Sequence, residues 1–159
     1  MRKQKGFSLI ELLIVVAIIL IIAAIAIPNL LRSRIAANEA SAVGSMRTIN
    51  TAEITYASTY PSVGYSPDLN SLAGASCTAP TSAAACLIDT TLAAATSSTG
   101  TGKSGYYFTF AADANLGYTL LGQPLHVNST GTKFFYTDGT AVIHYNNGSA
   151  ATSASAAIQ

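Results

Sequence analysis

The sequence predicts an α+β fold in which one long N-terminal helix packs on a small antiparallel β-sheet head. Two observations carry this prediction. Leu12 to Ile27 is a run of sixteen consecutive apolar residues, and a helical pattern continues beyond it to Tyr60. Aromatic and β-branched runs separated by turn residues follow only after residue 105. A helix followed by a group of strands is typical of α+β architecture, with the first half of the helix spanning a membrane and its second half amphipathic.

Composition limits the classes of function. The 159 residues suit one domain with an appendage. Half of them are hydrophobic and only 9% are charged, against about 25% in soluble globular proteins. The formal net charge is +1, so no basic field is present to hold nucleic acid. The composition argues against a cytosolic enzyme.

Residues 1–6 form a short basic leader, and residues 7–28 form the apolar segment that follows it. Phe7 to Ile27 would be about 31 Å long as a helix, which matches the thickness of a bilayer core. The basic residues of the leader predict that the N-terminus stays in the cytoplasm and that the rest of the chain is exported.

Three interpretations of this segment compete. It is a cleaved signal peptide, a plain signal anchor for an unrelated exported domain, or a helix that stays in the mature chain after only the basic leader is removed. Ala24-Ile25-Ala26 has the small-x-small form of a signal-peptide cleavage site. The apolar run, however, exceeds the usual 7–15 residues of a signal peptide. A signal peptide would also discard the carboxylate of Glu11 for no gain.

Glu11 is the informative residue of the segment. An ionisable side chain within an apolar span costs at least about 2.5 kcal/mol on insertion and is by default a hypothesis of function. The alternative is that Glu11 lies near the cytoplasmic headgroups and extends its carboxylate out to them.

Lys5-Gly6-Phe7-Ser8-Leu9-Ile10-Glu11, with the apolar run and Ile27-Pro28 after it, resembles the class III prepilin N-terminus of type IV pilins and type II secretion pseudopilins. The close resemblance covers residues 2–35. It implies that a prepilin peptidase cuts between Gly6 and Phe7 and methylates the new amine of Phe7. It further implies that Glu11 helps subunits dock by complementing that amine on a neighbour. A charge in a dry environment is tolerable only when paired, which fits this role.

The same resemblance implies the partners and the location. The partners are further copies of the chain in a helix-bundle polymer, the prepilin peptidase, and the pilus assembly platform with its motor ATPases. The subunit is expected first in the inner membrane, as a single-pass protein with its head in the periplasm, and then in an extracellular pilus.

Residues 29–60 read as an amphipathic helix that continues into the head. Pro28 removes one backbone hydrogen bond, so a kink or local melting is expected there. Glu53 falls on the apolar face without an evident reason, and Tyr60-Pro61 ends the helix. The apolar face comprises Leu31, Ile35, Ala42, Met46, Ile49, Tyr56 and Tyr60.

Residues 61–105 form an irregular loop region, with possible short helices at 68–72 and 89–95. Cys77 and Cys86 are too few for a structural zinc site, and in an oxidising compartment they favour a disulfide over two free thiols. The disulfide loop of familiar pilins lies nearer the C-terminus, so this position departs from the family's pattern and adhesive-loop functions are not transferred.

Residues 106–146 are predicted to form an antiparallel sheet of three or four strands. Asp138-Gly139 lies between two strand-like runs and predicts a tight hairpin there. Residues 147–159 are small and polar and are expected to be a flexible tail.

The sequence indicates no catalytic residues, cofactor or metal. His126 and His144 lack a nucleophile or ligand spacing, and the acidic residues are too scattered for a calcium site. The leading hypothesis is therefore a structural prepilin of a type IV pilus, serving adhesion, motility or DNA uptake. The alternatives are a pseudopilin of a type II secretion system and, from another class, a membrane-anchored binding module or enzyme.

Overall fold

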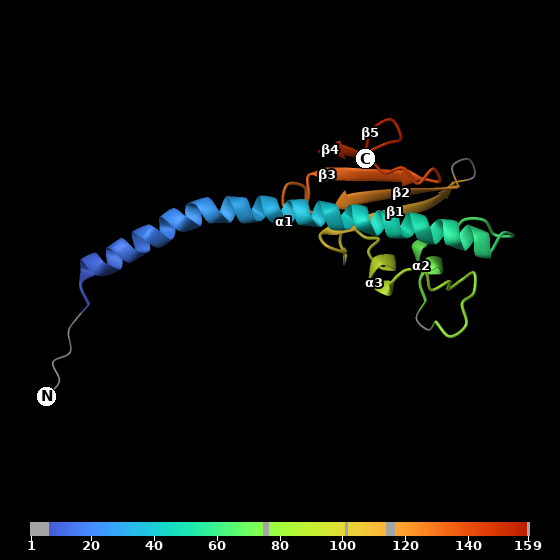
Figure 1. Ribbon diagram of the computed structural model, residues 1–159, viewed down its shortest axis with the longest axis horizontal. Coiled ribbons are helices and arrows are strands. Elements are labelled where there is room, and N and C mark those ends of the chain that lie inside the picture. The colour runs from blue at the N-terminus through green and yellow to red at the C-terminus, as the bar shows by residue number, and fades with distance from the viewer. Residues whose placement is uncertain (1–6, 75–76, 101, 114–116, 159) are drawn as a thin grey trace. The chain divides into compact units, whose positions relative to one another are not determined.

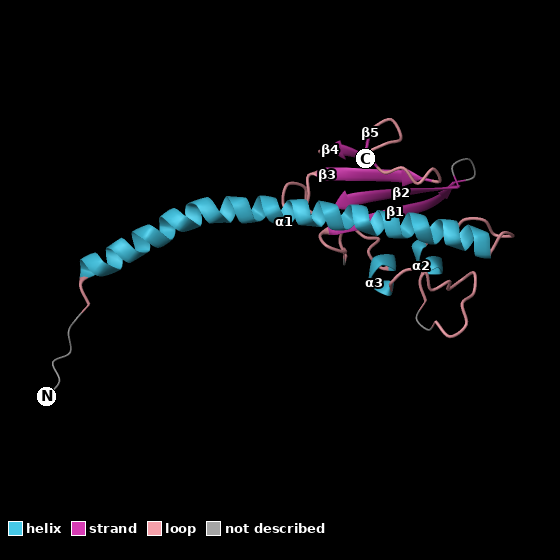
Figure 2. Ribbon diagram, in the orientation of Figure 1, coloured by secondary structure: helices cyan, strands magenta, loops and turns pink. Residues whose placement is uncertain are grey.

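The computed structural model describes residues 7–74, 77–100, 102–113 and 117–158. The chain divides into two compact units, residues 1–34 and residues 35–159. The elements are labelled in Figure 1 and coloured by type in Figure 2. In chain order they are α1 (Leu9–Thr59), α2 (Leu69–Leu72), α3 (Thr90–Ala93), β1 (Tyr106–Asp113), β2 (Gly117–Pro124), β3 (Lys133–Asp138), β4 (His144–Asn147) and β5 (Ala156–Ala157).

The sequence accounts for where helix α1 ends. Its last residue is Thr59, immediately before Tyr60-Pro61, because a residue that precedes proline disfavours helical geometry. The helix continues without interruption through Pro28. Local melting at Pro28 is therefore absent, and a kink there stays a prediction.

The five strands form one antiparallel sheet in the order β1-β2-β3-β4-β5, so each strand pairs with its neighbour in sequence. Burial alternates strictly along β2, where every second residue from Tyr118 to Pro124 is buried. This period of two places one face of the sheet in the core. The predicted α+β fold, a long helix on a small antiparallel sheet, is confirmed.

The second half of α1 lies along the inner face of the sheet in the head (Figure 2). Gly122 of β2 sets how closely the two approach, since a Cβ at this position would lie 3.1 Å from Met46 Sδ and 3.4 Å from Phe135 Cβ. The largest fully buried core side chains are Tyr56, Tyr106, Tyr118, Phe108, Phe135, Met46, Ile49, Leu69, Leu72, Leu92 and Leu120.

One buried polar contact joins helix to sheet inside this core. The Asn50 amide donates to Thr137 Oγ1 and to the Ala141 carbonyl, both at 3.2 Å, and accepts from Tyr118 Oη at 3.0 Å. A buried amide is tolerated because its groups are satisfied, and this geometry fixes the position of α1 along the sheet.

The tight hairpin expected at Asp138-Gly139 does not form, because β3 ends at Asp138 and β4 begins only at His144. Asp138 Oδ1 accepts from Thr140 N at 2.9 Å and from Thr140 Oγ1 at 2.6 Å. Ala141 then adopts a left-handed backbone with φ of 60°, and its carbonyl accepts from Asn50. Because of these contacts, residues 140–143 do not form a strand, although Thr140, Val142 and Ile143 are β-branched and favour one.

The C-terminal segment also differs from the expected flexible tail. Ala156 and Ala157 pair with β4 as the edge strand β5, and Ile158 N donates to Ile143 O at 2.8 Å. Ala151 is buried. Alanine residues have low strand propensity, so this pairing comes from tertiary contact and not from a local preference.

Candidate assembly site

Helix α1 starts with the glutamate half of a capping box. The Glu11 carboxylate reaches back and accepts from the Ser8 backbone N–H at 2.9 Å. Ser8 immediately precedes the helix, and a glutamate three residues after it satisfies one of the N–H groups that a helix start leaves free. Sequence reasoning missed this role, although the spacing Ser8-x-x-Glu11 is its standard signal.

The segment from Phe7 onward exposes an extended apolar surface. Phe7 is 75% exposed and Leu9 is 79% exposed. A shallow apolar groove of about 380 Å³ runs along this surface between Leu9 and Leu20. By length and composition, α1 is able to cross a membrane. So much apolar surface must be covered by lipid or by another protein surface.

In the head, Glu39 of α1 holds the start of β3. Its Oε1 accepts from Thr132 N at 3.0 Å, from Thr132 Oγ1 at 2.8 Å and from Lys133 N at 3.3 Å. Its Oε2 lies 3.3 Å from Lys133 Nζ. Burial alone would raise the pKa of Glu39, but the hydrogen bonds from Thr132 and Lys133 and the charge of Lys133 outweigh it and lower that pKa.

Glu53, the unexplained acid on the apolar face, is fully buried and binds the loop between α1 and α2. It accepts from Ser66 N at 2.9 Å and is in hydrogen-bond contact with Ser66 Oγ. Ser66 Oγ also lies 3.1 Å from the Asp68 carbonyl. A hydroxyl has one proton, so Ser66 Oγ shares it between the Glu53 carboxylate and the Asp68 carbonyl unless Glu53 is protonated and donates instead. Burial raises the pKa of Glu53, although the hydrogen bonds from Ser66 oppose the rise.

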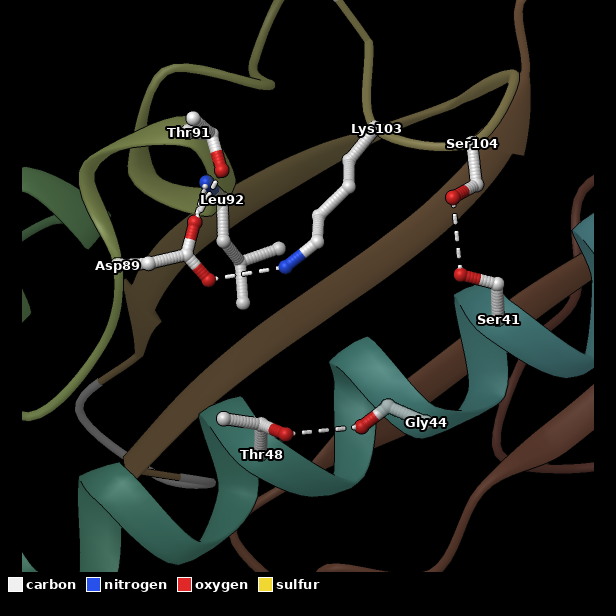
Figure 3. A network of polar contacts seen from close by, with 8 residues as sticks. All are labelled: Ser41, Gly44, Thr48, Asp89, Thr91, Leu92, Lys103 and Ser104. Carbon is white, nitrogen blue, oxygen red and sulfur yellow. Dashed lines mark hydrogen bonds and ion pairs between the residues drawn. The ribbon is translucent and has the colours of Figure 1, made fainter.

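Helix α3 and the chain before β1 are held by a second polar cluster, drawn in Figure 3. The Asp89 carboxylate caps α3 by accepting from Leu92 N at 2.7 Å, accepts from Thr91 Oγ1, and pairs with Lys103 Nζ at 2.9 Å. The hydrogen bond from Thr91 and then that from Lys103 lower the pKa of Asp89. Next to Lys103, Ser104 accepts a hydrogen bond from Ser41 of α1 at 2.9 Å.

Cys77 and Cys86 are joined by a disulfide bond. Tyr56 of α1 donates from its hydroxyl to the Ser82 carbonyl at 2.6 Å, inside the closed loop. Leu87 N, just after the loop, donates to Leu72 O at 2.7 Å. The loop is therefore attached to both α1 and α2.

The sequence analysis also singled out Gly6, His126 and His144. Gly6 lies outside the described residues. His126 is exposed, and His144 Nδ1 lies 2.7 Å from the Ser155 carbonyl, where it joins β4 to the C-terminal segment. Among the described residues no three histidine, cysteine or acidic side chains lie close enough to hold a metal ion.

Comparison with known proteins addresses the N-terminal segment. A family profile described as "Prokaryotic N-terminal methylation motif" matches residues 1–27. The type IV wide pilus major component PilA4 of Thermus thermophilus is 67% identical over 39 residues, which are 24% of this chain and 30% of that protein. The type IV major pilin protein PilA of Myxococcus xanthus is 45% identical over 51 residues, which are 32% of this chain and 23% of that pilin.

These matches show that a short stretch of the chain is similar to type IV pilins. The matched part is less than a third of either pilin's length. No solved structure matches the chain. The methylation-motif match covers the part of the chain that carries Glu11 and the start of the apolar surface.

Proposed function

We propose that this chain is a prepilin, cut between Gly6 and Phe7 and methylated at Phe7, whose mature form polymerises into a type IV pilus. The observation that carries the proposal is the exposed apolar surface of α1, headed by the carboxylate of Glu11, within a segment that matches the methylation motif. Lipid covers this surface before assembly, and the same surface of other copies covers it afterwards.

Docking requires that Glu11 exchange partners. In the single chain its carboxylate accepts from Ser8 N. After the cut, Phe7 carries a free positive amine one residue before Ser8. A subunit entering an apolar fibre core brings both charges out of water, and each is tolerable only with an opposite charge beside it. Glu11 of the incoming subunit therefore pairs with the Phe7 amine of its neighbour.

The proposed route follows from this chemistry. The precursor is held in the inner membrane with its N-terminus in the cytoplasm and its head in the periplasm. The prepilin peptidase acts on it there, and the assembly platform with its motor ATPases lifts the mature subunit into an extracellular fibre. Adhesion, motility and DNA uptake are the roles proposed for that fibre.

The test is electron microscopy of filaments sheared from cells, with the subunit identified by intact mass. We expect filaments whose subunit starts at a methylated Phe7. Gly6→Val is the matched control, because a side chain at the cut should leave uncut precursor in the membrane and no filaments. A mature chain starting near Ile27 would refute the proposal, since it would mean ordinary signal-peptide cleavage.

A secretion assay on a deletion strain and an activity assay on the head, read together with the microscopy, separate the alternatives. A type II secretion pseudopilin would give a secretion defect on deletion and no filaments on wild-type cells. A membrane-anchored enzyme or binding module would show activity of its head on a small molecule and no assembly at all.

A further inference from the structure

The head carries a groove between α1 and the strands at one edge of the sheet. Its volume is about 670 Å³ and it is open to solvent. Its lining is mostly apolar, with Ala36, Ala40 and Val43 on the α1 side and Phe135, Tyr145 and Ile158 on the sheet side.

Of the charged side chains that line this groove, one cation forms none of the ion pairs in the described part of the chain. Glu39 and Lys133 both line it, but they pair with each other. Arg47 also lines it and is exposed. Within the described residues the ion pairs are Lys133 with Glu39 and Lys103 with Asp89, and neither involves Arg47. An occupant that fits this groove is therefore apolar and carries one carboxylate.

The loop from Tyr60 to Asp68, between α1 and α2, has this chemistry. Pro61 and Val63 are exposed at its tip, Val63 by 52%. Asp68 is also exposed and forms no ion pair in the described part of the chain. Its Oδ1 accepts from Ser71 N at 2.8 Å, which leaves Oδ2 for a further partner.

The loop is already held in shape. Val63 N and Gly64 N donate to the Tyr60 carbonyl at 2.9 and 3.1 Å, and Ser66 is bound by buried Glu53. The ring centroids of Tyr65 and Tyr118 are 5.2 Å apart. A preorganised loop loses little conformational entropy on docking, so even a modest contact area contributes to binding.

Loop and groove are different patches of the same head. When one patch of a protein meets a different patch on the next copy, the contact is heterologous. Its repetition produces a helical filament, or a ring where the rotation closes, instead of a two-fold dimer. Opposite charge and apolar surface on both sides favour a second copy as the occupant.

We infer that the loop 60–68 of one subunit docks in the groove of the next, with Val63 against the apolar lining and Asp68 paired with Arg47. This inference rests on the proposed function and adds to it a contact between heads, separate from the contact between the apolar helices.

The first test is a double-mutant cycle on filament assembly in the full chain. The variants are Arg47→Glu, which reverses the charge, Asp68→Asn, which keeps the α2 cap but removes the charge, and the double variant. Arg47→Lys and Thr99→Glu are controls; the second adds a carboxylate to an exposed loop outside both patches. The readout is the ratio of filament-bound to membrane-bound subunit.

We expect Arg47→Glu to lower this ratio about two- to fivefold, as loss of an exposed ion pair does. Arg47→Lys and Thr99→Glu should match wild type. The double variant should be no worse than Arg47→Glu alone, because both changes remove one interaction. Losses that multiply in the double variant, or an Arg47→Glu protein that assembles like wild type, would overturn the pairing.

The second test places a photoreactive amino acid at Val63 and irradiates assembled filaments. We expect dimers whose cross-linked peptides contain residues 36–47 or 143–158 of the second copy. Cross-links to any other region refute the docking site while leaving filament formation intact. Absence of wild-type filaments would instead refute the proposed function itself.

Discussion

At the scale of single residues, Glu11 has two roles, one in capping α1 and one proposed in pairing with a neighbouring subunit. A substitution that removes both at once cannot tell them apart. Its carboxylate caps α1 through Ser8 N, and the proposal gives it a second partner in the fibre. Leucine removes the cap and the charge together. Glutamine keeps the cap, since capping boxes use either residue, and removes only the charge.

We predict that Glu11→Leu and Glu11→Gln proteins are both inserted and both cut after Gly6, yet both add poorly to the fibre. Leaving one member of a buried ion pair unpaired costs about 3–5 kcal/mol, which corresponds to a loss of docking of hundreds-fold or more. Quantifying the membrane pool and the filament fraction of each variant checks this. If Glu11→Gln assembles like wild type and Glu11→Leu does not, the residue acts as a cap and not as an ion-pair partner.

Glu53 gives a prediction on pH. Its folded-state pKa is raised by burial above the ordinary value of 4.5, so the folded chain keeps this proton to a higher pH than the unfolded chain. The stabilisation from Glu53 is fully present below pH 4.5 and is lost as pH rises through the folded-state pKa. Glu53→Gln mimics the protonated form, because its amide donates to Ser66 Oγ as the acid does.

The measurement is the thermal midpoint of full-length wild type and Glu53→Gln in detergent, from about pH 4 to about pH 8. Glu39, Asp89 and Asp138 have lowered pKa values, which act in the opposite direction but equally in both proteins. We expect the midpoint of wild type relative to Glu53→Gln to fall as pH rises. A difference independent of pH would show that folding does not raise the pKa of Glu53.

At the scale of elements, Gly122 lies in a closely packed position and Gly44 faces open space, so substitutions at the two should have opposite effects. A Cβ at Gly122 would press on Met46 and Phe135, whereas a Cβ at Gly44 on α1 meets nothing within 4 Å. Gly122→Val should lower the free energy of unfolding by about 1–3 kcal/mol through overpacking. Gly44→Ala should raise it by up to about 1 kcal/mol through helix propensity. Denaturant unfolding of both variants in detergent checks the pair, and equal effects would contradict the packing described for β2.

The elements also show which parts of the fold a sequence alone can specify. The end of α1 at Tyr60-Pro61, short helices near residues 68–72 and 89–95, and an antiparallel sheet after residue 105 follow from local preferences and were predicted. The wide turn after Asp138 and the strand β5 were not. They depend on Asn50 and on the edge of β4, which are partners distant in sequence.

The features of the candidate site also differ in whether the sequence alone could predict them. Glu11 stands out locally, because a carboxylate within an apolar run is conspicuous in any sequence. Glu53 was recognised only as an anomaly, since its partner Ser66 lies beyond the end of the helix. The groove beside Arg47 could not be foreseen, because it exists only after the C-terminal strand folds back on the sheet.

At the scale of the whole molecule, the two units should respond separately to damage. Replacing both Cys77 and Cys86 by serine removes the constraint on the unfolded loop and should lower head stability by about 2–3 kcal/mol. Membrane insertion and cutting after Gly6 should be unchanged, because they depend on residues 1–27. Thermal unfolding together with the N-terminal mass of the membrane-bound protein checks both parts. Accumulation of uncut double variant would show that the peptidase step requires an intact head.

Because the head carries few charges, its folding and its contacts with other copies should respond differently to salt concentration. Asn50, Tyr118 and Tyr56 hold the head through hydrogen bonds between neutral groups, whereas Lys103 and Asp89 lie in contact with solvent. Dissolved salt screens exposed charges over a distance that shrinks from about 8 Å at physiological strength to about 3 Å in strong brine. It leaves buried hydrogen bonds almost unaffected. Brine or fresh water should therefore change how firmly Arg47 and Asp68 join one copy to the next, while each copy stays folded.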